Sequence, residues 1–268
     1  MLRAESVSFG YGDREHAFSL DNVSVTIADG SLTGLLGPNG CGKTTLLKLL
    51  CGVLQPVRGT VTLAARTFEG PRPLHSMSRR ELARHVAVVP QETHPAFEYT
   101  VMEMVLMGRH PHLSQFQLEG PSDFAIAREA LAATGTDHLA DRNYMTLSGG
   151  EKQRVIIASA LAQQTEILLL DEPTASLDLG YQLDIAALLA ALNRERRVTM
   201  VLATHDLNLA AALCDRLILM RGGRVLAQGP TADVLTGAKV RELYDVDADV
   251  EFHQRSGHLI VLPVKRLR

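Results

Sequence analysis

The sequence feature that most constrains the fold is a glycine-rich segment between an apolar run and a run of helix-forming residues. The segment contains, in order, Gly37, Pro38, Asn39, Gly40, Cys41, Gly42, Lys43 and Thr44, and Thr45 follows it. Residues 32–36 before it are mostly apolar, and residues 44–51 favour a helix that ends at Gly52. This order of strand, loop and helix predicts a phosphate-binding loop in an α/β fold.

The residue types in this segment suit the binding of phosphate groups. Glycines allow successive backbone N–H groups to point at phosphate oxygens. Lys43 adds a mobile positive charge for the β- and γ-phosphates, and the hydroxyl of Thr44 is a suitable ligand for Mg²⁺. A chance glycine-rich turn is the alternative, and the strand before and the helix after the segment weaken it.

Composition narrows the class of protein. With 268 residues, 46% of them hydrophobic, the chain can bury the core of one large α/β domain or of two smaller lobes. The net charge of −3 provides no overall positive field, so we expect no nucleic acid partner. The three scattered cysteines predict neither a disulfide framework nor a metal site, which favours a reducing compartment.

Membrane-spanning segments are not expected from the sequence. Its apolar runs fall far short of the roughly 20 residues that cross a bilayer. The first six residues lack the apolar stretch of a secretory signal. If the protein serves a membrane process, another chain is expected to span the membrane.

The spacing of apolar residues predicts two kinds of sheet. Residues 6–9 and 20–27 alternate in the manner of half-buried strands, which indicates an antiparallel sheet at the start of the chain. Residues 167–170 and 198–203 are continuous apolar runs, typical of central strands in a parallel sheet that is covered on both faces.

Between these sheets the spacing becomes helical. Thr100 and Glu103 have the spacing of a capping box, and residues 122–133 are expected to form another helix. Towards the end of the chain, residues 224–228 favour a strand, and residues 250–263 are expected to form a hairpin that turns at Ser256 and Gly257.

Polar residues follow three of the predicted strands. Asp171 and Glu172 come directly after the run at 167–170, His205 follows the run at 198–203, and Gln91 follows the strand-like residues 86–90. Ligands of parallel sheets bind at the carboxyl ends of the strands. The alternatives are that the carboxylates only cap a strand end, that His205 is structural, and that Gln91 is an ordinary surface residue.

A second helix start with phosphate-binding character lies at residues 147–151. Ser148 and Glu151 form a capping box, so an ordinary helix start explains both residues. Gly149 and Gly150 weaken a helix near its first turn and favour close approach of a nucleotide. Exposed N–H groups at a helix N-terminus attract phosphate.

Taken in order, these motifs resemble the ATP-binding cassette (ABC) family from residue 6 to about residue 245. The resemblance implies an α/β P-loop NTPase cassette, with a RecA-like core, an N-terminal antiparallel β-subdomain and an inserted helical subdomain. We expect a single domain over residues 1–268, with a core lobe at 1–91 and 165–237. The helical subdomain at 92–164 then contains the signature motif, and a short C-terminal extension covers 238–268.

The resemblance also implies roles for single residues. ATP and Mg²⁺ are the expected ligands, with Mg²⁺ held by Thr44, Gln91 and Asp171. The implied catalytic residues are Lys43, Gln91, Glu172, which polarises the attacking water, and His205, which contacts the γ-phosphate. Besides Gly37 to Thr45, Tyr11 is expected to stack on adenine, although a tyrosine that packs a turn is the alternative.

Two further expectations concern neighbouring subunits and the loop cysteine. In the family, two subunits form a head-to-tail homodimer, which implies that Ser148, Gly149, Gly150, Glu151 and Asp178 contact the nucleotide held by the partner. Cys41 lies beside a helix N-terminus, and we expect an acidic thiol there, whose alkylation would block ATP binding.

Residues 78–84, 100–103 and 108–113 are similar to segments of importers of ferric siderophores, haem and vitamin B12. This implies an ATPase at the cytoplasmic face of the inner membrane, with two permease subunits and an extracytoplasmic substrate-binding protein. Another ABC importer, an exporter, or a soluble ABC ATPase that acts on ribosomes or DNA remain alternatives. His110 and His112 could suggest a metal site, but a solvated loop without nearby carboxylates is preferred.

Overall fold

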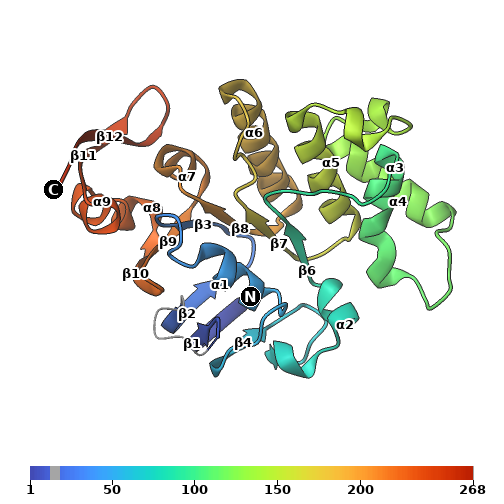
Figure 1. Cartoon of the computed structure of the whole chain (residues 1–268), viewed down its shortest axis with the longest axis horizontal. Helices are drawn as coiled ribbons and strands as arrows, with labels where there is room; N and C mark the ends of the chain where they lie inside the picture. Colours follow the sequence, from blue (N-terminus) through green and yellow to red (C-terminus); the bar gives the residue numbers. More distant parts are fainter. Residues whose placement is uncertain (13–18, 268) are drawn as a thin grey trace.

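The computed structural model describes residues 1–12 and 19–267, and its centre is a six-stranded sheet (Figure 1). In chain order the strands are β3 (Leu32–Leu36), β6 (Val86–Val89), β7 (Ile167–Asp171), β8 (Thr199–Thr204), β9 (Arg216–Arg221) and β10 (Arg224–Pro230). Their order across the sheet is β10, β9, β3, β8, β7, β6, and all pairs except β10 with β9 are parallel. The predicted parallel core strands are confirmed.

A second, antiparallel sheet is formed by the beginning of the chain, as predicted. It has the order β2, β1, β4, β5, with β1 (Leu2–Gly10), β2 (Ser19–Ile27), β4 (Arg58–Leu63) and β5 (Arg72–Pro73). Helix α1 (Lys43–Leu50) packs between the two sheets, because its Leu46 shares one buried cluster with Leu2 of β1 and Leu169 of β7. This packing fixes the start of α1 beside the ends of the central strands.

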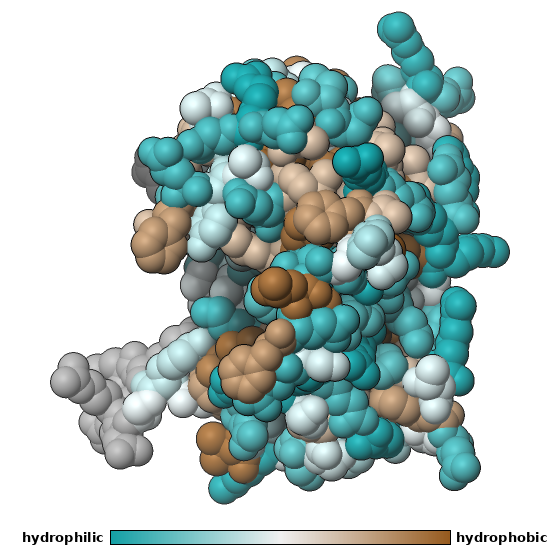
Figure 2. Space-filling model, turned by 90° about the vertical axis from the view of Figure 1, so that its right-hand side faces the viewer, coloured by the Kyte–Doolittle hydropathy of each residue, from teal (hydrophilic) through white to brown (hydrophobic). Residues whose placement is uncertain are grey.

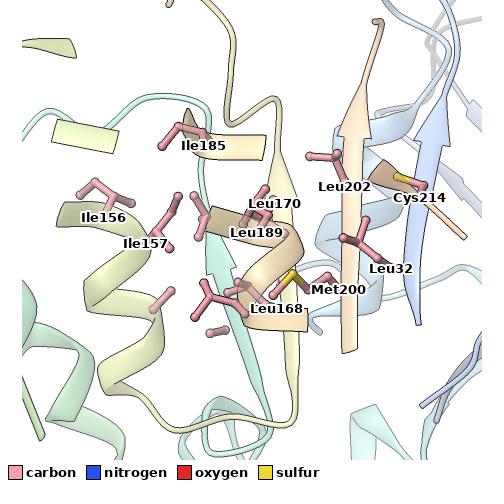
Figure 3. Packing of buried hydrophobic residues seen from close by; sticks show 14 of the residues in the cluster. Leu32, Ile156, Ile157, Leu168, Leu170, Ile185, Leu189, Met200, Leu202 and Cys214 are labelled. Atoms are coloured by element: carbon pink, nitrogen blue, oxygen red, sulfur yellow. The ribbon is translucent and has the colours of Figure 1, made fainter. Parts of the chain in front are cut away.

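Most other helices lie at the β6 end of the central sheet or, in the case of α6, over its middle (Figure 1). They are α2 (Arg79–Ala83), α3 (Val101–Leu106), α4 (Pro121–Ala133), α5 (Gly149–Ala162) and α6 (Leu179–Arg196), with the short 3₁₀ helices η1 (Leu74–Ser76), η2 (Met107–His112), η3 (Asp137–Leu139) and η4 (Tyr144–Thr146). The capping box predicted at Thr100 and Glu103 is present. Ile157 of α5, Leu189 of α6 and Leu170 of β7 share one core (Figure 3), so helix α5 is anchored to the central sheet.

The surface at this helical end is mainly hydrophilic. Figure 2 shows that hydrophilic residues cover most of the face, while hydrophobic residues are visible in several small groups, near its middle and towards its lower left. Among residues 1–12 and 19–267, no helix combines the length and the apolar character needed to cross a membrane.

The elements that follow β8 lie at the other end of the sheet (Figure 1). Besides β9 and β10 they are α7 (Leu207–Leu213), α8 (Thr231–Val234), α9 (Gly237–Tyr244), β11 (Val246–His253) and β12 (His258–Arg266). Strands β11 and β12 form the predicted hairpin, which is longer than expected. It turns at Gly257, whose φ of 76° lies in the left-handed region that favours glycine.

The loop expected at His110 and His112 is instead the 3₁₀ helix η2, in which His110 is exposed, as expected, and His112 is partly buried. The neighbouring Arg109 is buried, with its Nε donating to Oδ1 of Asp123 at 3.0 Å. A carboxylate is therefore close, although it binds arginine and not a metal. Within the part of the chain that the structure describes, no cluster of three or more His, Cys, Asp or Glu side chains could hold a metal ion.

Candidate functional site

The glycine-rich segment links the end of β3 to the start of α1. Gly42 precedes the helix with φ 110°, a left-handed conformation that other residues rarely adopt. At Gly37 a side chain is excluded for a different reason, because a Cβ atom there would lie 2.2 Å from the carbonyl oxygen of Met220. The loop therefore lies tightly against the end of β9 and leaves the N-terminus of α1 open. Such a terminus attracts anions.

Lys43, the first residue of α1, folds back over this loop. Its side chain is only 5% exposed, and its Nζ donates to the carbonyl oxygen of Gly37 at 2.8 Å. Nζ also lies 3.7 Å from Oε1 of Glu172. The lysine charge is therefore placed between the loop and the carboxyl end of β7, as expected for a group that binds phosphate.

Asp171, the last residue of β7, has an oxygen without a partner. Its Oδ1 is buried and makes no hydrogen bond to any described residue. Burial raises the pKa of this carboxyl, and a hydrogen bond with Thr44 lowers it. A buried carboxylate oxygen beside a threonine hydroxyl is a donor set that suits Mg²⁺, which prefers oxygen ligands.

Glu172 has a strained backbone conformation. Its φ is 48°, and its amide donates to the carbonyl oxygen of Ala203 at 2.9 Å. A left-handed conformation in a residue other than glycine costs on the order of 1–3 kcal/mol and is common at functional sites. The conformation turns the carboxylate towards His205 and Lys43, since Oε2 lies 3.2 Å from Nδ1 of His205 and Oε1 lies 3.7 Å from Nζ of Lys43.

A cavity of about 400 Å³ opens beside these groups. It is lined by Tyr11, Asn39, Gly40, Gly42, Lys43, Thr44, Thr45, Gln91 and Glu172, all of which were predicted as site residues. Its volume falls within the range of roughly 300–1,000 Å³ that is usual for ligand pockets. Tyr11 is 46% exposed and its ring packs edge-on against Phe9 at 4.9 Å, so the tyrosine stands at the mouth of the cavity.

The segment at 148–151 does not line this cavity. Ser148 caps α5 by accepting from the amide of Glu151 at 3.4 Å, while the Glu151 carboxylate accepts from the amide of Ser148 at 2.8 Å. Asp178 has the same type of role at α6, where it accepts from the amide of Tyr181 at 3.0 Å. The predicted capping box is confirmed, and both motifs lie apart from the cavity of their own chain.

The structure adds a second reason for the glycine at position 150. Close approach of a nucleotide was expected to explain it, and the ring of Tyr181 in the same chain also leaves no room for a side chain there. A Cβ atom on Gly150 would lie 2.3 Å from Cδ1 of that ring. At Gly149 the nearest atom would be 3.4 Å away, on Leu177. Packing inside the chain therefore requires a glycine at position 150, and the contacts of Gly149 and Gly150 with a partner's nucleotide stay predictions.

The expectation of an acidic thiol at Cys41 is also wrong. Its side chain is 3% exposed and points into the core between the two sheets. Burial raises the pKa of this thiol, and the nearby charge of Lys43 lowers it less. A helix N-terminus lowers the pKa of a cysteine only when the thiol is accessible to it.

We therefore expect a maleimide to label Cys51 first, because it is only half-buried. Cys41 and Cys214 are buried and should react only after unfolding. Mass spectrometry of the native protein after brief labelling near neutral pH would measure the order. Rapid labelling of Cys41 in the native protein, absent from a Cys41→Ser variant, would contradict this prediction.

Sequence reasoning did not identify Tyr244 as part of this region. Its hydroxyl lies 3.5 Å from the carbonyl oxygen of His205. Tyr244 ends α9, more than thirty residues after His205, and belongs to none of the motifs considered above. No local sequence signal marks a contact of this kind, because the fold alone brings α9 to the carboxyl end of β8.

The chain is similar to known proteins over most of its length. A family model described as ABC transporter matches residues 20–175. The ferric enterobactin transport ATP-binding protein FepC of Escherichia coli is 38% identical, over 99% of this chain and 94% of that protein. The hemin import ATP-binding protein HmuV of Bordetella pertussis is 42% identical, over 91% and 93%. The cobalamin import ATP-binding protein BtuD of Halobacterium salinarum is 41% identical over 91% of this chain, which spans only 60% of that relative.

Solved structures show the same fold. A metal-chelate type ABC transporter in an inward-facing conformation matches with a TM-score of 0.85 and 29% identity, over 100% of this chain and 98% of that one. A dimeric post-hydrolysis state of the cassette MJ0796, bound to ADP and phosphate, matches with a TM-score of 0.72 and 28% identity, over 86% and 99%.

Proposed function

The chain belongs to the ABC transporter family, and on this basis we propose that it is the ATP-hydrolysing subunit of an importer for an iron chelate, haem or cobalamin. The observation that carries the proposal is the convergence of Lys43 and Glu172 on one cavity at the phosphate-binding loop, with His205 in contact with the Glu172 carboxylate. The names of the relatives, which are transport proteins for ferric enterobactin, hemin and cobalamin, support the class of substrate.

In this proposal the loop holds the phosphates of ATP, and Glu172 acts on the attacking water. The N–H groups at the start of α1 and Nζ of Lys43 balance the phosphate charge. The carboxylate of Glu172 orients the water and accepts its proton, a role that commonly contributes about 10²–10⁴-fold to a rate. His205 contacts the γ-phosphate, Gln91 lines the cavity from the β6 side, and Tyr11 stacks on the adenine at its mouth.

Mg²⁺ is the proposed cofactor. The hydroxyl of Thr44, the carboxylate of Asp171 and the amide of Gln91 would hold it together with phosphate oxygens. The orphan oxygen of Asp171 and its bond with Thr44 support this assignment. When bound, the ion supplies positive charge that neutralises the phosphates during hydrolysis.

We further propose a head-to-tail homodimer as the active form. Ser148, Gly149, Gly150 and Asp178 lie outside the cavity of their own chain, although they resemble residues that contact nucleotide in the family. A partner chain would bring them to the ATP, and Glu151 would keep its capping role. The similarity to a dimeric cassette bound to ADP and phosphate supports this arrangement.

The domain organisation and the other subunits are part of the same proposal. Residues 92–164 act as a helical lobe against a core lobe of 1–91 and 165–237, with 238–268 as an extension. Two integral-membrane permease subunits hold the ATPase at the cytoplasmic face of the membrane, and an extracytoplasmic protein delivers the substrate. The inward-facing transporter with the same fold supports the permease contact.

Transport by reconstituted vesicles tests the proposal. We expect ATP-dependent uptake of a ferric siderophore, of haem or of cobalamin when the chain is combined with permease subunits encoded beside its gene. The same vesicles with a Lys43→Ala chain should show background uptake, because the phosphate charge is no longer balanced. ATP-dependent efflux, or uptake of none of the three substrates, would overturn the proposed substrate class.

A further inference from the structure

The end of the chain contacts the segment that carries His205 at two points. We call helix α9 with strands β11 and β12 the C-terminal unit, which covers residues 237–266. His205 follows β8 directly and precedes α7 by a single residue, Asp206. Its side chain is 57% exposed, and its recorded polar contact is with Glu172. The position of the imidazole therefore depends strongly on how its backbone is held.

The first contact fixes the start of α7. Asn208 donates from Nδ2 to the carbonyl oxygen of Val261 at 3.2 Å, and its Oδ1 accepts from the amide of Val261 at 2.7 Å. Asp206 caps the same turn by accepting from the amides of Asn208 and Leu209, each at 2.9 Å. The turn immediately after His205 is thus bonded both to its own cap and to strand β12.

The second contact is made by Tyr244, the last residue of α9. Its hydroxyl lies 3.5 Å from the carbonyl oxygen of His205, and the backbone of Gly37 also faces it. The helix end is itself anchored, because Arg221 of β9 binds Asp245 with Nη2 and Oδ2 2.6 Å apart. The tyrosine therefore connects the phosphate-binding loop and the histidine segment, and the next residue, Asp245, is bonded to β9.

Burial of Tyr244 keeps its hydroxyl in the donor form. Burial raises the pKa of the phenol, and the negative charge of Glu172 and Asp206 raises it further, while the Gly37 backbone lowers it. A protonated hydroxyl donates to a carbonyl oxygen, whereas a phenolate would repel it.

We propose that the C-terminal unit positions His205 for ATP hydrolysis, with Tyr244 and the Asn208–Val261 pair as its two anchors. The inference rests on the proposed function, since it concerns how the site hydrolyses ATP. Tyr244 is a positioning residue that acts through the backbone of His205. A displacement of about 1 Å at a reacting group can cost on the order of 10²-fold in rate, so loss of an anchor is measurable.

The test compares Tyr244→Phe with Tyr99→Phe. The first change removes one hydroxyl and keeps the ring. Tyr99 is also partly buried against the core, and its hydroxyl has no recorded hydrogen bond in residues 1–12 and 19–267. We expect Tyr244→Phe to lower kcat about 10-fold with KM for ATP unchanged, whereas Tyr99→Phe should retain the parent kcat. Asn208→Ala should reproduce the loss of kcat.

Coupling to His205 separates positioning from general destabilisation. In a His205→Ala background, where residual phosphate release is followed with radiolabelled ATP, Tyr244→Phe should change the rate by less than about twofold. A full 10-fold loss in that background, or a parental kcat in Tyr244→Phe alone, would overturn the inference. Absence of ATP hydrolysis by the parent protein would instead count against the proposed function.

Discussion

Replacement of Glu172 by Gln is expected to lower the rate of ATP hydrolysis by about 10²–10⁴-fold while ATP still binds. The amide has nearly the shape of the carboxylate but cannot accept a proton from water. The change leaves the phosphate-binding loop and Lys43 in place, so the groups that hold the phosphates remain. Phosphate release measures the first effect, and titration with a fluorescent ATP analogue measures the second.

The same variant should accumulate as an ATP-bound dimer. Under the proposed mechanism, hydrolysis opens the dimer, so a chain that binds ATP without hydrolysing it should elute as a dimer in the presence of ATP and Mg²⁺. Glu195→Gln is a suitable control, because Glu195 is an exposed carboxylate near the end of α6. Turnover by Glu172→Gln at the parental rate would require another residue to act on the water.

The parts of the site that could be predicted are those determined by neighbouring residues in the chain. The phosphate-binding loop needs glycines at fixed positions between a strand and a helix, and all of that information lies within residues 32–52. Asp171 and His205 were placed correctly because they end apolar runs, and the ends of parallel strands meet at one edge of a sheet. The capping boxes at Thr100 and Ser148 were predicted because each is formed within four consecutive residues.

The features of the site that were not predicted depend on residues that are distant in the sequence. The side chain of Cys41 is buried because α1 lies between two sheets, which no local pattern indicates. The ring of Tyr181, thirty-one residues further along the chain, packs so closely against Gly150 that no side chain fits there. In both cases packing between distant parts of the chain sets the surroundings of a residue that a local rule had assigned to the ligand site. The position of Tyr244 beside His205, which no local rule predicted, also depends on such packing.

The segment at 108–113 shows what such packing contributes to stability. Arg109 and Asp123 have side chains that are only 7% and 8% exposed, and they join η2 to the first turn of α4. Arg109 also donates from Nη1 to the carbonyl oxygen of Ala162 at 2.7 Å and to Oε1 of Gln164 at 3.0 Å. The pair therefore joins the C-terminal end of α5 to η2 and α4. Ser148 lies at the opposite end of α5.

Loss of the carboxylate at Asp123 should destabilise the protein by about 3 kcal/mol, because Arg109 would be left buried without its ionic partner. This value is the low end of the roughly 3–5 kcal/mol that is usual when one partner of a buried ion pair is removed. The backbone amide of Gly120 and the guanidinium of Arg109 lower the pKa of Asp123, while desolvation raises it less. Urea unfolding of Asp123→Ala and of the parent would measure the difference.

Two comparisons distinguish a buried ion pair from an ordinary contact. Asp21→Ala breaks an exposed pair between Asp21 and Arg224, whose side chains are 53% and 69% exposed, and should cost no more than about 1 kcal/mol of stability.

Because the folded-state pKa of Asp123 is lowered, the contribution of its carboxylate to stability is fully present above about pH 3.9 and is lost as the pH falls through the folded value. The gap between parent and Asp123→Ala should therefore narrow only in that acidic range. Equal losses of stability in Asp21→Ala and Asp123→Ala at neutral pH would contradict this prediction. They would mean that solvent screens the charge of Arg109 although its side chain is buried.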